Sequence, residues 1–227
     1  MSKLTSRQKI LFGVYSMILA IIGDYLLGYQ TFGTSSSPDA YMGITWNVVP
    51  DWRYAVSSIL GFACAALFAI GAIELFKVME NKYHLADTKL YKLFKVANWG
   101  GILYFAFIHI GICILPVVFN AGMEATGDIE ASASMMIRVL KSELIPLLVG
   151  FVVCDLFVTI GWIGMVIKGM LPVKKWMIIC CPVFGVIFGN LLNLISEGLD
   201  SGTESLGWLM LYLVCALSLT DKKRSIK

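Results

Sequence analysis

Long apolar runs, nearly free of charged residues, divide this sequence into membrane-length segments. Six runs are apparent, at Ile10–Tyr29, Arg53–Phe76, Val96–Phe119, Leu144–Ile167, Trp176–Ile195 and Leu206–Thr220. The first five have the roughly 20 residues that an α-helix needs to cross a bilayer. The sixth has 15 residues, which as a helix reach only about 22 Å of a hydrocarbon core about 30 Å thick.

Composition agrees with this pattern. The chain has 227 residues, of which 58% are hydrophobic and 15% are charged, whereas soluble domains carry about a quarter charged residues. The length suits one compact bundle and leaves no room for a soluble domain. The first run ends without a small-residue cleavage site, so we expect it to be retained as a helix. The sequence predicts an all-α, polytopic integral membrane bundle of six transmembrane helices that forms a single domain over residues 1–227.

The basic residues set the orientation, because Lys and Arg are retained on the cytoplasmic side of a membrane. Fifteen of the 18 Lys and Arg residues precede the first run, separate the second from the third and the fourth from the fifth, or follow the sixth. Only Arg53, Arg138 and Lys141 fall on the other side. We therefore expect a multi-pass protein of the bacterial cytoplasmic membrane with both termini in the cytoplasm, which requires the short sixth span.

Two long outer loops follow from this topology. The first, over residues 30–52, carries Trp46 and Trp52, which could be interfacial anchors or a lid over a pocket. The second, over residues 120–141, has apolar residues at helical spacing and predicts a short amphipathic helix on the membrane surface. The alternative for the second loop is a plain extension of the fourth span.

Several classes of function are disfavoured by what the apolar runs contain. All six cysteines lie in these runs without Cys-x-x-Cys spacing, and we interpret them as small buried side chains. Of the two histidines only His109 lies in a span, so no metal site is predicted. No phosphate-binding glycine loop or nucleophile motif lies where it could act. We expect no cofactor and no nucleic-acid partner.

The informative residues are the polar ones inside the spans, because a charge at the bilayer centre costs at least about 2.5–3.5 kcal/mol on insertion scales. Glu74 precedes Lys77 by one helical turn, and an ion pair between them would explain it without function. The remaining candidates for a ligand-binding cluster are Asp24, His109, Glu143, Asp155, Asn190, Asn193 and Glu197. Their depths along the helices agree, which predicts a polar cavity that opens outward.

No Lys or Arg lies deep in a span to balance Asp24 and Asp155. The acids must then be protonated, paired with His109, or compensated by a bound cationic group. Asp24 and His109 are expected to approach one another across the first and third spans. The alternative is that both residues, with the Asn side chains, form hydrogen bonds that only join helices.

The segment Gly23–Gly28 (GDYLLG), Trp46 in the following loop and Phe107–His109 in the third span carry a family resemblance. In these residues the chain resembles a bacterial family of six-helix membrane proteins known only as a domain of unknown function, a likeness that implies the topology but no activity. The Gly-Asp pair in an apolar helix is also similar to membrane-embedded lysoplasmalogenase-like hydrolases. Those enzymes have more helices and more polar residues than this chain, which places their activity in doubt here.

Three functions remain open. The first is binding or translocation of a small amphiphilic or cationic ligand, with membrane lipids as neighbours, at an outward-facing intramembrane pocket. The second is an intramembrane lipid-modifying enzyme, in which His109 acts as general acid or base and Asp24 or Asp155 orients it or shares its proton. The third is a membrane partner or immunity-type protein whose polar residues are structural.

Overall fold

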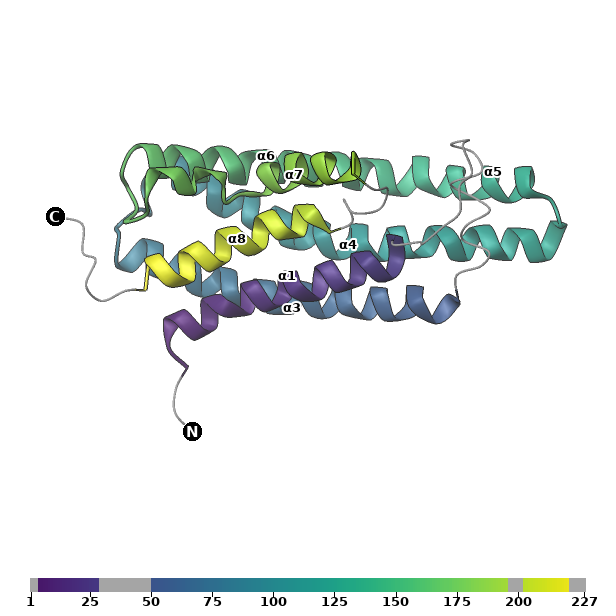
Figure 1. The fold of residues 1–227 in the computed structure, drawn as a ribbon, viewed down its shortest axis with the longest axis horizontal. Helices are drawn as coiled ribbons and strands as arrows, with labels where there is room; N and C mark the ends of the chain where they lie inside the picture. Colours follow the sequence, from purple (N-terminus) through teal and green to yellow (C-terminus); the bar gives the residue numbers. More distant parts are fainter. Residues whose placement is uncertain (1–3, 29–49, 196–201, 221–227) are drawn as a thin grey trace.

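A computed structural model describes residues 4–28, 50–195 and 202–220, and every regular element in these ranges is helical (Figure 1). The helices are α1 (Ser6–Gly28), α3 (Asp51–Asn81), α4 (Lys89–Thr126), α5 (Ile129–Val139), α6 (Ile145–Ile167), α7 (Pro182–Asn193) and α8 (Thr203–Ser218), with a π-helical turn η2 (Leu140–Leu144) and a 3-10 turn η3 (Lys175–Ile179). They run along one long axis of the molecule (Figure 1). The all-α prediction is confirmed for the described ranges.

Four segments are long and apolar enough to cross a membrane. They are Ser6–Leu26, Asp51–Asn81, Lys89–Thr126 and the continuous rod Ile129–Ile167. Each contains one of the first four apolar runs or nearly all of it. The protein thus has the helices of a membrane protein, and the expected count of six spans stays a prediction.

The fifth apolar run differs from the single long helix expected for it. Its start forms η3, the chain is extended at Cys181, and α7 begins only at Pro182 and has 12 residues. A helix of that length spans about 18 Å. Proline lacks an N–H and has a backbone angle preset for the first helical turn, so Pro182 begins this helix and does not bend a longer one.

The second outer loop also differs from the amphipathic surface helix expected there. Helix α5 packs along α4, where Gly122 lies so close to Ser132 that a methyl group on the glycine would lie 3.0 Å from Ser132. Met136 is buried in this contact. The turn η2 then joins α5 to α6, and the hairpin formed with α4 projects beyond the other helices (Figure 1). The alternative, an extension of the fourth span, is the correct one.

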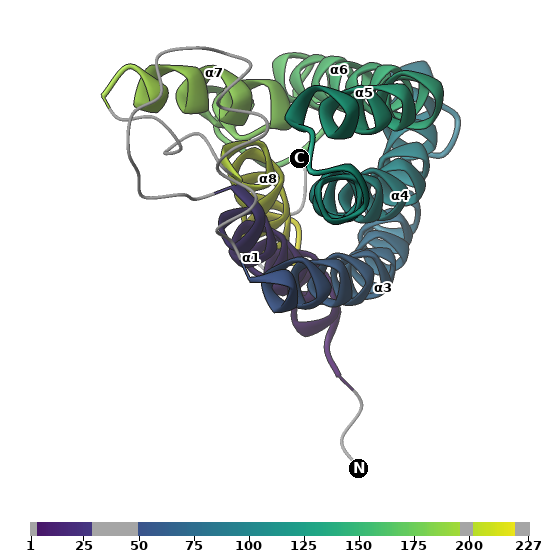
Figure 2. The ribbon, with the colours of Figure 1, turned by 90° about the vertical axis from the view of Figure 1, so that its right-hand side faces the viewer.

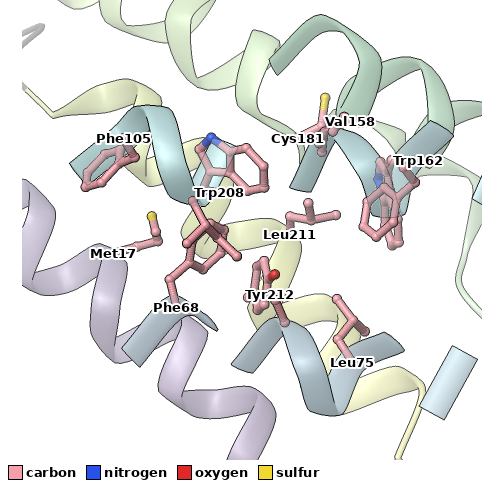
Figure 3. Close-up of a cluster of buried hydrophobic side chains, with 14 of the residues drawn as sticks. Met17, Phe68, Leu75, Phe105, Val158, Trp162, Cys181, Trp208, Leu211 and Tyr212 are labelled. Carbon is pink, nitrogen blue, oxygen red and sulfur yellow. The ribbon is translucent and has the colours of Figure 1, made fainter. Parts of the chain in front are cut away.

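Helix α8 lies among the others and carries much of the core (Figures 2 and 3). Trp208 meets the ring of Phe68 edge-on at 5.2 Å between ring centroids, and Tyr212 lies 4.8 Å from the same ring. The Tyr212 hydroxyl donates a hydrogen bond to Asn98 Oδ1 at 3.0 Å. The short sixth helix is therefore an internal element of the bundle, with its large side chains packed against α1, α3 and α4.

Ion pairs gather at the end of the bundle where α1 begins. Glu74 accepts a hydrogen bond from Ser6 Oγ at 2.6 Å and pairs with Lys9 Nζ at 3.3 Å. The ion pair within 4 Å is made with Lys9 of α1, and the expected partner Lys77 acts on Glu74 only as a nearby positive charge. The interpretation of Glu74 as a structural residue needs no change.

Candidate functional site

A cavity of about 420 Å³ lies between α1, α4, α6, α7 and the first turn of α8. Its polar lining consists of Asp24, His109, Asn190, Thr203, Glu204 and Ser205. Its apolar lining comes mainly from α4 and α6, namely Phe105, Ile108, Ile112, Leu148, Phe151 and Val152, with Val186 from α7. Most polar lining residues come from α1 and the start of α8, and we call the polar set the polar wall; most apolar ones come from α4 and α6, and we call that set the apolar wall.

Asp24 and His109 meet at the polar wall. The Asp24 Oδ1 atom lies 3.2 Å from His109 Nδ1, across α1 and α4. The imidazole side chain is 4% exposed and the carboxylate 25% exposed, so the carboxylate is the member of the pair that the cavity can reach. Ser205 Oγ donates to the second carboxylate oxygen at 3.3 Å. The predicted approach of Asp24 to His109 is confirmed.

Ser57 of α3 holds the other side of the imidazole. His109 Nε2 lies 2.9 Å from Ser57 Oγ and 3.0 Å from the Ser57 carbonyl oxygen. The Ser57 hydroxyl also donates to the carbonyl oxygen of Gly23 at 2.8 Å. Both ring nitrogens of His109 therefore have protein partners. Sequence reasoning missed Ser57, because one serine in an apolar helix carries no signal until a residue 52 positions away packs against it.

The residues Asp24, His109 and Ser57 have the order of contacts of a catalytic triad. Ser57, however, is fully buried and does not line the cavity. Its hydroxyl is directed at the Gly23 carbonyl oxygen, and an attacking serine needs an accessible oxygen next to the substrate. The arrangement fixes the imidazole in place and presents no nucleophile.

Two glycines give the imidazole its space. A methyl group on Gly23 would lie 3.1 Å from His109 Nε2, and one on Gly61 would overlap the ring. Phe105 stacks on the same imidazole, with ring centroids 6.0 Å apart and planes 19° apart. The Gly-Asp pair of α1 therefore has a physical basis, since the glycine admits the histidine that the aspartate contacts.

A pair of acidic residues lies beside the Asp24–His109 pair. Asp155 of α6 is buried and accepts a hydrogen bond from Trp208 Nε1 at 3.1 Å. Its carboxyl group is also hydrogen-bonded to that of Glu204, which lines the cavity. Glu204 lies just before the sixth apolar run and was not among the predicted site residues, but α8 begins at Thr203, three residues before that run, and includes it. Acidic residues favour a first helical turn, which is a signal that could have placed it.

Of the other predicted site residues, one lines the cavity, one does not, and two cannot be placed from the described part of the structure. Asn190 lines the cavity, and its Nδ2 donates to the Val186 carbonyl oxygen at 2.9 Å. Glu143 lies in η2, is exposed and does not line the cavity. The Asn193 side chain and all of Glu197 lie outside the described part of the structure, as does Trp46.

The thiols and metal-ligand side chains form no further site in the described ranges. All six cysteines are free, and only Cys154 is more than slightly exposed. No group of three or more His, Cys, Asp or Glu side chains is placed to hold a metal ion among the described residues. The polar wall of the cavity is thus the candidate functional site.

Comparison with known proteins gives a family but no activity. No curated protein and no solved structure matches the chain. A family model described as a family of unknown function, DUF6796, matches residues 1–222. This match covers nearly the whole chain and agrees with the resemblance seen in the GDYLLG segment and around His109. The chain therefore belongs to the DUF6796 family, whose function is unknown.

Proposed function

We propose that this protein is a six-span protein of the bacterial cytoplasmic membrane that binds a small amphiphile in the cavity between α1, α4, α6, α7 and α8. The observation that carries the proposal is the division of the cavity into one polar and one apolar wall. Its volume of about 420 Å³ lies in the range of small-molecule sites, roughly 300–1,000 Å³. A polar head group would lie against Asp24, Glu204 and Ser205, and a short tail along Phe151 and Leu148.

The distribution of charge supports an outward position for this site. The basic residues gather where α1 begins and where α3 meets α4. Loops rich in Lys and Arg favour the cytoplasmic side of a membrane. Asp24 is 18 residues beyond Ser6 along α1, a rise of about 27 Å. The polar wall is accordingly at the end of α1 opposite to these basic residues.

Exposure of the lining residues supports access from the bilayer. Val152 on α6 is 62% exposed and Val186 on α7 is 41% exposed, yet both line the cavity. Apolar side chains that are exposed on the surface of a membrane helix face lipid. An amphiphile could therefore enter between α6 and α7 without leaving the membrane, whether it is bound only or moved onward.

A pair of neighbouring substitutions on α6 tests this proposal. Leu148→Trp adds bulk to the cavity, whereas Val149→Trp changes a lipid-facing residue that is 59% exposed. Each protein is purified in mild detergent, and molecules that co-purify are identified by native mass spectrometry and lipid extraction. We expect an amphiphile with the unmodified protein and with Val149→Trp, and its loss with Leu148→Trp. Equal retention by both variants, or no amphiphile with any of the three, contradicts the proposal.

The contacts of His109 favour binding over acid–base catalysis. A general acid or base must reach the reacting atom directly or through one water. Both imidazole nitrogens already contact protein atoms, on Asp24 and on Ser57. The enzyme alternative would have to act through Asp24, the exposed member of the pair, with His109 as its positioning partner.

A further inference from the structure

The charges around the cavity do not balance, and this imbalance bears on the class of ligand. This inference rests on the proposed amphiphile site. Asp24 has His109 as a partner that can carry a positive charge. Among the described residues, the charges that act on Glu204 are those of Asp155 and Asp24, both acidic. No Lys or Arg is among the residues that line the cavity in the described part of the chain.

The contact between Asp155 and Glu204 limits the charge that the pair can carry. A hydrogen bond between two carboxyl groups requires one shared proton. The pair therefore carries at most one negative charge, and Trp208 Nε1 donates to its Asp155 side, where that charge would be stabilised. Glu204 forms the side that lines the cavity. A charge removed from water without a counter-charge is unfavourable by several kcal/mol, so a positive group in the cavity would be stabilised there.

Aromatic rings supply a second, independent feature of the site. Phe105 and Phe151 both line the cavity, with ring centroids 6.1 Å apart. Ring faces attract ammonium groups, and alkylammonium ligands are commonly held by aromatic side chains. Carboxylate and aromatic groups on facing helices together favour a cation over an anion or a neutral sugar.

We propose that the amphiphile carries a cationic alkylammonium head group. This group binds at the Asp155–Glu204 pair, on its Glu204 side, while the tail lies along the apolar wall. The pair acts as one monovalent anionic site. Either single amide substitution, Asp155→Asn or Glu204→Gln, leaves one carboxylate and supplies an amide that can replace the shared hydrogen bond. Only the double substitution removes the negative charge.

The test uses two probes with the same tail, decyltrimethylammonium and uncharged decyl glucoside, and measures their equilibrium binding to the full chain in maltoside micelles. We expect the unmodified protein to bind the cationic probe more tightly. The double variant Asp155→Asn/Glu204→Gln should lose at least about tenfold in affinity for it, which is about 1.4 kcal/mol. The single variants should lose less, and Glu143→Gln, at an exposed carboxylate outside the cavity, should not change the affinity.

Each alternative outcome has a distinct meaning. If the unmodified protein binds both probes equally, or if the double variant keeps the cationic probe, the cation proposal is overturned while the amphiphile site stands. If neither probe binds, or if Leu148→Trp leaves both unaffected, the proposed function itself fails. The comparison of the two probes on the unmodified protein holds even where the double variant does not fold.

Discussion

Replacement of Asp24 separates a ligand-binding role from a structural one. In the unmodified protein His109 Nδ1 lies 3.2 Å from the Asp24 carboxylate, with the imidazole 4% exposed. A hydrogen bond to a charged group contributes about 1.5–3 kcal/mol and a neutral one about 0.5–1.5 kcal/mol. Asp24→Asn keeps an oxygen acceptor at the same place. Because the carboxylate is a quarter exposed and partly screened, we expect a loss near the lower difference, about 1 kcal/mol of unfolding free energy.

Asp24→Leu should behave differently. It removes the acceptor from a buried imidazole nitrogen and from the Ser205 hydroxyl, and a buried donor without a partner costs about 1–3 kcal/mol. We expect a loss of about 2–3 kcal/mol, roughly twice that of Asp24→Asn. Under the proposed function both variants also lose the co-purifying amphiphile, since Asp24 lines the cavity.

The assay is denaturant unfolding in detergent, together with ligand retention measured by mass spectrometry. Full ligand retention by Asp24→Asn with normal stability would favour the alternative in which the polar residues only join helices. A stability of Asp24→Leu equal to that of the unmodified protein would refute the role assigned to the Asp24–His109 contact.

Three further predictions follow from particular contacts. Gly61→Ala should lose about 1–3 kcal/mol of stability through overlap with the imidazole, whereas Gly101→Ala, whose added methyl would meet its nearest atom at 3.4 Å, should be neutral in the same unfolding assay. Trp208→Phe removes the indole donor to Asp155 and should cost about 1.5–3 kcal/mol, and an unchanged thermal midpoint would contradict that hydrogen bond. For topology, a reporter inserted at Gly127, the turn between α4 and α5, should be active outside the cytoplasm and one fused after the C-terminus inside it, and activity of both on one side would exclude an even number of spans.

The sequence alone determined the membrane-length apolar helices and three residues of the polar wall, Asp24, His109 and Asn190. Apolar runs of about 20 residues have few structures open to them other than membrane helices, because backbone groups in lipid must be paired within the segment. The same regularity fixes depth at about 1.5 Å per residue, so the meeting of Asp24 with His109 could be predicted from the numbering of two helices. The importance of Asp155 followed from its cost in lipid.

Tertiary packing decided what depth could not. Depth along a helix says nothing of the direction in which a side chain points, so Glu143 was included although it is exposed. Ser57 contacts His109 only because Gly23 and Gly61 leave room for the ring. Pro182 lies inside the fifth apolar run, and only the packed chain shows that it begins α7.

The acidic pair is the clearest case of a feature outside the reach of sequence reasoning. Glu204 lies before the sixth apolar run and looks like a loop residue, yet the first turn of α8 brings it to Asp155, 49 positions earlier in the chain. Hydropathy is a property of each segment, whereas a shared proton or an uncompensated charge is a property of two segments in contact. The sequence could therefore predict that the protein belongs in a membrane, and only the arrangement of its helices could show which acids line the cavity together.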